Sequence, residues 1–430
     1  MSSNLGTTEA ELTARRAALT LILGVITGCT SRGGPEGRPT EVPAPATRDV
    51  EIRIGLLVGA ASAVLGGSGS TIVTEPDGSA VVTIPAGETW QLAAAGKRLT
   101  LTSPGGWRSR PLDAITATAK DPRAPLRVNG RSYRGVADVL RDSSGLTIVN
   151  RLGMESYLLG VVSAEMGRRS AAEHAALKAQ AVVSRTYALR NLGRWRSQGF
   201  DLYATVSDQA YGGVAAETIE GRAAVAATRG QVLTYKGAPI EAFYFSTCGG
   251  RTADGYEVFR GASKPYLRSA YDVAPNGMAY CSISPRYRWR EEWTGENLRA
   301  ILGRYLPQIK GRKPGSIDRV ADIRVTQRSG SGRVDQLAVS AGGPEIRVDG
   351  HTAIRQVLRT SAGDLLRSAS FTLAADGAGR NVTHLVADGM GAGHGVGLCQ
   401  WGAVGRARSG QEYRQILAAY YPGTTLMRRY

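Results

Sequence analysis

One acidic side chain stands where it could transfer protons. Glu165 follows the apolar run of residues 161–164, VVSA, at the junction of two segments with helical spacing. A carboxyl group beside an apolar surface has a raised pKa, because removal from water disfavours its charged form. Such a group keeps its proton near neutral pH and can act as a general acid. The alternative is a solvated glutamate that interacts with a helix end, which is the commoner situation.

Two helices are predicted to position Glu165. Residues 155–166 repeat apolar side chains at a helix-compatible spacing. A second helix opens with Ser170 and Glu173, the spacing of a capping box in which each side chain satisfies a backbone N–H group of the other residue. Its face over residues 175–188 is rich in alanine. Such a face allows another helix or a sheet to approach closely.

Other catalytic patterns are weaker. Residues 389–397 are rich in glycine, but no reading frame gives the GxGxxG or GxxxxGK[ST] spacing of a phosphate loop. The glycines around His394 indicate a backbone that closely approaches a ligand or another strand, and His394 itself is either structural or substrate-facing. Ser246 and Thr247 precede a Cys-Gly-Gly turn, but no GxSxG motif and no identifiable partner histidine accompany them. The sequence therefore shows no nucleophile triad.

Several long stretches resemble the SpoIID/LytB family of bacterial cell-wall proteins, which is named after a stage II sporulation protein and an amidase enhancer. They are YLLGVVSAEM, ALKAQAVVSRTYAL, DQAYGG, ATRGQVLTYKGAPIEAFYFSTCGGRT, PYL, GHGVGLCQWGA and YRQILAAYYPGTTL. They occur in the family's order, and the resemblance extends from about residue 50 to the end of the chain. One segment departs from the family pattern, since residues 167–174 lack the proline and tryptophan that relatives often have there.

The resemblance implies a lytic transglycosylase that cleaves peptidoglycan glycan strands. Glu165 matches the family's essential acid, which would protonate the glycosidic oxygen and then accept the proton of the attacking muramoyl C6 hydroxyl. This chemistry requires no metal or cofactor, although some relatives in the family bind a structural zinc ion. The alternative is a non-catalytic module that binds glycan and enhances a wall amidase, so a wall amidase is a possible partner. The family stretches contain these candidate substrate-binding residues: Lys178, Arg185, Gln209, Tyr211, Ser246, Tyr266, His394 and Gln400. Lys178 and Arg185 share a helix face, and one of them can instead pair with a structural carboxylate.

The N-terminus reads as a secretory lipoprotein signal. Arg15 and Arg16 precede an apolar run, residues 17–26, that is too short to span a bilayer permanently. Residues 26–29, ITGC, resemble a lipobox, so Cys29 is predicted to be lipidated; an ordinary signal peptide with a chance cysteine is the alternative. We expect an exported protein that is anchored by lipid on the outer face of the cytoplasmic membrane.

The chain is strongly basic, with 53 lysines and arginines against 36 acids and a net charge of +17. This charge favours an anionic partner. The arginines are scattered along the chain, and the predicted export signal removes nucleic acid as a partner. An anionic bacterial envelope fits the diffuse charge at least as well.

The remaining cysteines are Cys248, Cys281 and Cys399. An exported protein occupies a compartment that permits disulfides, and a Cys248–Cys281 bond would stabilise the fold by roughly 3 to 4 kcal/mol on the chain-entropy model. Zinc is the competing interpretation. The absence of CxxC, HExxH and neighbouring histidines favours the disulfide, with Cys399 free and buried.

The pattern of elements predicts an α+β fold, with mixed strands around a central helical pair and a β-rich N-terminal region. We expect a signal peptide over residues 1–29, a tether rich in Pro and Gly over 30–49, the β-rich region over 50–125 and the SpoIID/LytB-like catalytic domain over 126–430. An Asn-Gly pair inside residues 126–133 predicts a hairpin. Residues 231–235 and 240–246 are expected to form another.

Overall fold

The computed structural model describes residues 49–261, 263–310, 317–377 and 381–430. Cys29, the predicted signal peptide and nearly all of the predicted tether lie outside these residues. In the part that is described, no helix is both long and apolar enough to cross a membrane. The fold is mixed, with 26% helix and 36% strand in several sheets and a β-rich N-terminal region, which confirms the predicted α+β class.

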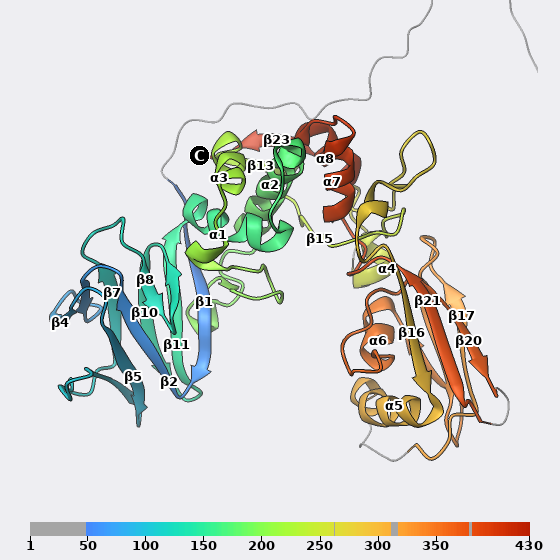
Figure 1. Cartoon of the computed structure of the whole chain (residues 1–430), viewed down its shortest axis with the longest axis horizontal. Helices are drawn as coiled ribbons and strands as arrows, with labels where there is room; N and C mark the ends of the chain where they lie inside the picture. Colours follow the sequence, from blue (N-terminus) through green and yellow to red (C-terminus); the bar gives the residue numbers. More distant parts are fainter. Residues whose placement is uncertain (1–48, 262, 311–316, 378–380) are drawn as a thin grey trace, which may run out of the picture. The chain divides into compact units, whose positions relative to one another are not determined.

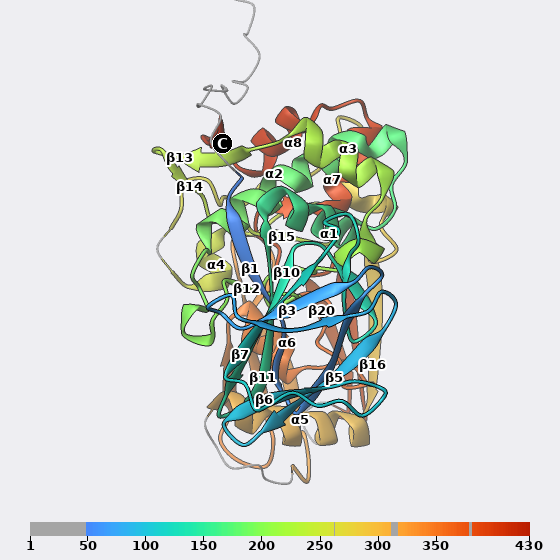
Figure 2. The ribbon, with the colours of Figure 1, turned by 90° about the vertical axis from the view of Figure 1, so that its left-hand side faces the viewer.

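The N-terminal strands form two sheets whose buried faces share one hydrophobic core, and Figure 2 shows them towards the viewer. In spatial order the seven-stranded sheet contains β12 (Leu202–Tyr203), β1 (Glu51–Ala60), β11 (Gly145–Gly153), β10 (Val136–Asp142), β7 (Ala114–Ala119), β3 (Thr71–Thr74) and β4 (Ala80–Ile84). The five-stranded sheet contains β6 (Arg98–Thr102), β5 (Thr89–Ala95), β2 (Ser62–Gly67), β8 (Leu126–Val128) and β9 (Arg131–Tyr133). Both sheets therefore take strands from each side of residue 125.

The predicted Asn-Gly hairpin is confirmed. Asn129 and Gly130 connect β8 to β9 with φ angles of 47° and 77°. Positive φ at both central residues is what a type I′ turn requires, and asparagine and glycine tolerate it.

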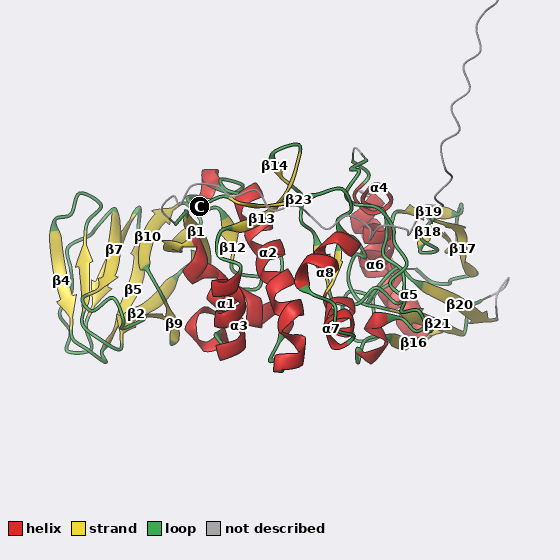
Figure 3. Ribbon diagram, turned by 90° about the horizontal axis from the view of Figure 1, so that it is seen from above, coloured by secondary structure: helices red, strands yellow, loops and turns green. Residues whose placement is uncertain are grey.

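A layer of helices follows β11 (Figure 3). The first of these helices contains Glu165. The central helix is α2 (His174–Arg190), which contacts α1 (Met154–Met166), α3 (Ile219–Ala227), α7 (Gln400–Arg408) and α8 (Tyr413–Tyr420). The predicted capping box is present: the Ser170 backbone N–H donates to Glu173 Oε2 at 2.9 Å in the short 3₁₀ turn before α2. A three-stranded sheet of β14 (Ala238–Pro239), β13 (Gln231–Tyr235) and β23 (Thr425–Arg428) accompanies the helices.

Buried apolar residues of the described segments between Trp289 and Ala387 form a second hydrophobic core. Its helices are α5 (Gly295–Lys310) and α6 (His351–Val357), drawn beside β16 in Figure 1. One three-stranded sheet contains β16 (Arg288–Thr294), β21 (His384–Met390) and β20 (Phe371–Asp376), and the other contains β17 (Asp322–Arg328), β18 (Val334–Ser340) and β19 (Ile346–Asp349). The short helix α4 (Gly255–Phe259) precedes this part of the chain.

The second predicted hairpin forms only in part. β13 turns back at Lys236 and Gly237 and pairs with Ala238 and Pro239, which precede the expected partner strand, and its other neighbour is β23. Proline has no N–H group to donate to a ladder, which limits this pairing. The expected partner strand, residues 240–246, instead contains β15 (Tyr244–Phe245), which pairs in parallel with β22 (Leu398–Cys399). This parallel pair brings two segments distant in sequence beside Glu165.

Candidate active site

Glu165 lies in the last turn of α1, half-buried, and accepts three hydrogen bonds. The Ala210 backbone N–H and the Tyr244 hydroxyl donate to Oε1 at 2.7 and 2.9 Å. The Gln400 amide donates to Oε2 at the longer distance of 3.3 Å. Tyr244 comes from β15 and Gln400 follows β22, so the parallel strand pair positions both donors.

A directed chain of hydrogen bonds supports the Tyr244 hydroxyl. The Gln209 amide donates to that hydroxyl at 3.2 Å and accepts from the Tyr157 hydroxyl at 3.3 Å. Gln209 and Tyr157 are fully buried. Because the Tyr244 oxygen receives one hydrogen bond and gives one, its proton is directed at Glu165.

The environment of Glu165 favours its protonated form. Burial raises the pKa of this carboxyl, and the hydrogen bonds from Ala210, Tyr244 and Gln400 only partly reverse that effect, so the pKa lies above its ordinary value. Oε1 is the more fully engaged oxygen, with two short hydrogen bonds. The geometry thus leaves Oε2 as the oxygen with room for a proton.

Glu165 lines a cavity of about 760 Å³ with both aromatic and basic walls. The aromatic and basic residues are Arg169, Tyr187, Arg194, Phe243, Tyr244, Phe245, Phe259, Arg286, His394 and Trp401. The Arg169 guanidinium stacks 4.4 Å from the centre of the Trp401 ring. A neighbouring cavity of about 790 Å³ shares Tyr187, Arg194, Phe243 and Phe259 with the first.

Asp208 is the second carboxylate among the described lining residues, and its oxygens are fully engaged. Its side chain has no exposed surface. The Tyr187 hydroxyl donates to Oδ1 at 3.1 Å, and Trp195 Nε1 and the Tyr203 backbone N–H donate to Oδ2, both at 2.9 Å. Arg194 Nη1 forms an ion pair with Oδ1 at 3.1 Å. A carboxylate held in this way shapes the wall of the cavity and has no free position for a water molecule.

Four of the predicted substrate-binding residues gather here. Gln400 and Gln209 act on Glu165 as described, and Ser246 and His394 line the cavity. Burial lowers the pKa of His394 to about 4, so the imidazole is neutral at neutral pH. Its Nδ1 accepts from the Val396 backbone N–H at 3.1 Å, which leaves Nε2–H to donate to the Tyr244 carbonyl at 2.9 Å. His394 therefore holds the backbone of the residue that contacts Glu165.

The structure keeps the other four away from the described lining of this cavity. Lys178 lies near the Tyr413 ring, with Nζ 5.9 Å from its centre. Arg185 is fully buried and pairs with Glu155, which matches the structural carboxylate considered from the sequence.

Tyr211 and Tyr266 are also buried. The Tyr211 hydroxyl donates to Asn150 at 2.9 Å, and its ring lies so close to Gly160 of α1 that a side chain there would collide with it. The Tyr266 ring packs 5.5 Å from that of Tyr235. Both tyrosines therefore act within the core of the fold.

Sequence reasoning missed Tyr244, the backbone N–H of Ala210 and the pairing of Arg169 with Trp401. Tyr244 and Trp401 lie inside stretches that carry the family resemblance, and this position could have identified them as candidate site residues. Ala210 contributes only its backbone N–H group, so the type of its side chain gives no indication of this role. Arg169 lies in the segment that departs from the family pattern, where the resemblance gives no guidance.

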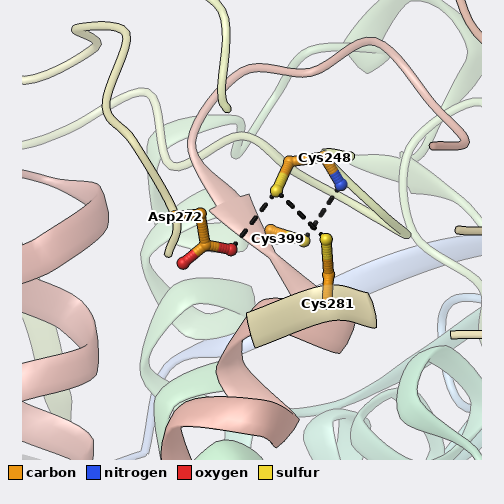
Figure 4. Close-up of side chains that lie close together, drawn as sticks. All are labelled: Cys248, Asp272, Cys281 and Cys399. Atoms are coloured by element: carbon orange, nitrogen blue, oxygen red, sulfur yellow. Dashed lines mark hydrogen bonds between the residues drawn. The ribbon is translucent and has the colours of Figure 1, made fainter. Parts of the chain in front are cut away.

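The three remaining cysteines converge in the interior (Figure 4). All three are free and buried, and Sγ of Cys248 and of Cys281 are 3.4 Å apart. A disulfide bond is about 2.05 Å long, so these sulfurs are neighbours that are not bonded. The disulfide and the zinc site considered from the sequence are therefore alternatives at this place, and Cys399 lies beside both sulfurs.

Comparisons with known proteins cover the helices around Glu165 and much of the rest of the chain. Residues 142–235 match the family model of SpoIID, Stage II sporulation protein, and residues 279–397 match a domain of unknown function (DUF8618). An uncharacterized protein of Brachyspira hyodysenteriae is 30% identical over 302 residues, which cover 70% of this chain and 73% of that protein. Stage II sporulation protein D of Bacillus subtilis is 28% identical, over 65% of this chain and 75% of the relative.

The amidase enhancer of Bacillus subtilis is also similar, at 28% identity over 63% of this chain, although only 40% of that longer protein is covered. The matched family region contains α1, α2, Glu165 and Asp208. The chain belongs to the SpoIID domain family.

Proposed function

We propose that this protein acts on peptidoglycan at the cell envelope and cleaves its glycan strands as a lytic transglycosylase. Membership of the SpoIID family and similarity to a sporulation protein and an amidase enhancer support the cell-wall role. The observation that carries the enzymatic proposal is Glu165. It is a carboxyl group with a raised pKa, directed by three donors, in the wall of a cavity.

The reaction needs one group that is first an acid and then a base. Protonated Glu165 gives its proton from Oε2 to the oxygen between N-acetylmuramic acid and N-acetylglucosamine, and the bond from muramoyl C1 to that oxygen breaks. The muramoyl C6 hydroxyl then attacks C1 and closes a 1,6-anhydro ring. Its proton passes to the Glu165 carboxylate, which restores the acid. The Ala210 and Tyr244 donors stabilise the carboxylate between the two steps.

The engagement of Asp208 favours this route over hydrolysis. Hydrolytic glycosidases use a second carboxylate as nucleophile or as the base that activates water. Asp208 is the one other acid among the described residues lining the cavity, and three hydrogen-bond donors and the ion pair with Arg194 already hold it. An attacker that belongs to the substrate removes the need for that second group.

The walls fit an anionic, extended sugar chain. Arg169, Arg194 and Arg286 place positive charge around the cavity, and aromatic side chains offer apolar faces for sugar rings. A muramoyl residue without a stem peptide carries a free lactyl carboxylate, which such arginines can bind in a bidentate manner. The adjoining cavity extends the shared aromatic wall, as a polymer requires.

The second candidate function is a glycan-binding module that enhances a wall amidase. The similarity to the amidase enhancer and the divergent segment after Glu165 favour it. In both cases we propose an exported protein with a lipid anchor at Cys29.

The test is cleavage of denuded and intact peptidoglycan by the wild-type protein and by Glu165→Gln, with the glycan ends identified by mass spectrometry. The substitution removes the titrating proton, so anhydromuramoyl ends should fall by about 100- to 10,000-fold. Exposed Glu296→Gln is the matched control and should cleave normally. Because burial penalises the charged Glu165, the glutamine variant should be at least as heat-stable as wild type at neutral pH. Wild-type rates in Glu165→Gln would exclude it as the acid, and binding without cleavage by both forms would favour the enhancer.

A further inference from the structure

Four buried side chains from distant parts of the chain direct their ligand atoms at one point (Figure 4). They are Cys248 after β15, Asp272 in the loop after α4, Cys281 in a short 3₁₀ turn and Cys399 in β22. The relative exposure of Cys248 is 2%, and that of the other three is 0%. We propose that Cys248, Asp272, Cys281 and Cys399 bind one structural zinc ion, a site that is independent of the proposed glycan chemistry.

The spacing of the four groups fits a single tetrahedral ion. Their ligand atoms all lie within 4.8 Å of one another. Cys248 Sγ is 3.4 Å from Cys281 Sγ and 3.3 Å from Asp272 Oδ2. With Zn–S bonds of about 2.3 Å, a tetrahedral site separates its sulfurs by roughly 3.8 Å. The set is too closely spaced to surround a multi-iron cluster, and its three sulfur donors disfavour calcium and magnesium.

Backbone N–H groups already point at the sulfurs. Cys399 Sγ accepts from Cys248 N and Gly402 N at 3.1 and 3.2 Å, and Cys248 Sγ accepts from Gly250 N at 3.3 Å. Cys399 is also the N-cap of α7, whose dipole favours negative charge there. These donors stabilise thiolates, which are the form that binds zinc.

The Asp272 carboxylate is held in place by further hydrogen bonds. Arg406 Nε donates to Asp272 Oδ1 at 2.9 Å, and the Tyr420 hydroxyl donates to Oδ2 at 2.9 Å. Gly402 permits this approach, since a side chain at that position would collide with Asp272 and Tyr420. Such second-layer contacts orient metal ligands and are a usual part of metal sites.

The local charge is consistent with a divalent cation. Three thiolates and one carboxylate bring four negative charges, which are too costly to bury without compensation. Arg406 supplies one positive charge, and buried Arg333 lies close by, with Nη2 donating to the Cys248 carbonyl at 3.1 Å. A divalent ion supplies the remaining two charges. Four protein ligands without exposed surface leave no open position, so this site is structural.

The zinc ion would fix the frame of the candidate active site. Cys248 lies four residues after Tyr244 along the chain, and Cys399 immediately precedes Gln400. Tyr244 and Gln400 are two of the donors to Glu165. A zinc ion that binds both Cys248 and Cys399 would therefore link the segment just after β15 to β22, close along the chain to the residues that carry these donors.

The test is the metal content of the full chain, purified in detergent without added metal or chelator. We expect one zinc ion per chain by inductively coupled plasma mass spectrometry. A mercurial reagent that titrates thiols should release it, as followed with a chromogenic chelator. Cys281→Ser and Asp272→Asn should retain much less zinc, while Cys29→Ala is the matched cysteine control and should retain it all. Release of zinc from the wild-type protein tests the proposal even if a variant fails to fold.

Two outcomes overturn the proposal. One is a metal-free protein in which Cys248, Cys281 and Cys399 all react with an alkylating reagent. The other is a Cys248–Cys281 disulfide found by non-reducing peptide mapping. Zinc retention by Glu165→Gln separates this site from the glycan chemistry, because the metal content does not depend on cleavage.

Discussion

Arg185 of α2 and Glu155 of α1 form a two-point ion pair inside the helix layer. Arg185 Nε donates to Glu155 Oε1 at 2.8 Å and Nη2 donates to Oε2 at 2.7 Å. The remaining guanidinium nitrogen donates to the Gln231 carbonyl at 3.0 Å, and the Tyr430 hydroxyl donates to Glu155 Oε1 at 2.8 Å. This network ties α1 and α2 to β13 and to the last residue of the sequence.

Replacing Arg185 with methionine should strongly destabilise the fold. The change leaves the buried Glu155 carboxylate without its cation, and breaking a buried pair in this way costs about 3 to 5 kcal/mol. Chemical denaturation followed by circular dichroism measures the loss. Arg190→Met on the same helix is the control, since this exposed arginine should change stability by less than about 0.5 kcal/mol. Equal effects of the two substitutions would contradict the structural role of Arg185.

The same network should make the fold sensitive to acid. Burial alone would raise the pKa of Glu155, but hydrogen bonds and charge from Arg185, with further help from Tyr430 and Gly230, lower it below its ordinary value. A depressed carboxyl pKa adds stability above the unfolded pKa of about 4.3, and that stability disappears as the pH falls through the folded pKa. Thermal midpoints measured from pH 7 downwards should fall below about pH 4.3, and Glu155→Gln should show a shallower fall.

Tyr244→Phe should shift the pH dependence of glycan cleavage upwards. The hydroxyl donates to Glu165 and lowers the pKa of that carboxyl, so its removal raises the pKa further. The acid then stays protonated to higher pH, and the alkaline limb of kcat/KM should move in that direction. A lost hydrogen bond to a charged group, about 1.5 kcal/mol, should lower the maximal rate about tenfold. Tyr266→Phe is the control, and a shift to lower pH in Tyr244→Phe would contradict the assigned donor.

Cys29→Ala should release the protein from the membrane fraction. The prediction rests on Arg15, Arg16, the apolar run and the lipobox-like ITGC. Fractionation and the mass of the mature N-terminus measure the outcome, with Ser31→Ala as a control that should remain anchored. Unchanged membrane binding of Cys29→Ala would contradict lipidation at this residue.

The helices around Glu165 were predictable because their signals are local. Apolar spacing placed the first helix over residues 155–166, and the structure has it at Met154–Met166. Ser170 and Glu173 marked the start of the second helix through chemistry confined to one turn. Apolar periodicity and capping residues are recognised within a few residues, so they predict a helix without knowledge of the tertiary fold.

The partners of Glu165 were not predictable in this way. Gln400 lies 235 residues further along the chain. The strands that deliver Tyr244 and Gln400 have two residues each, too few for any period to show. Arg185 illustrates the same limit, because an arginine on an alanine-rich helix looks alike in sequence whether it meets substrate or a buried carboxylate.

The pairing of β15 with β22 also decides when the candidate site can exist. Glu165, Ala210 and Tyr244 are translated long before Gln400, so during synthesis Glu165 lacks one donor and β15 lacks its strand partner. A fragment that ends before residue 398 has the same deficiency. The three donors to Glu165 are thus assembled only after residue 400 has been synthesised. Partly made or proteolytically trimmed copies should be inert toward the wall.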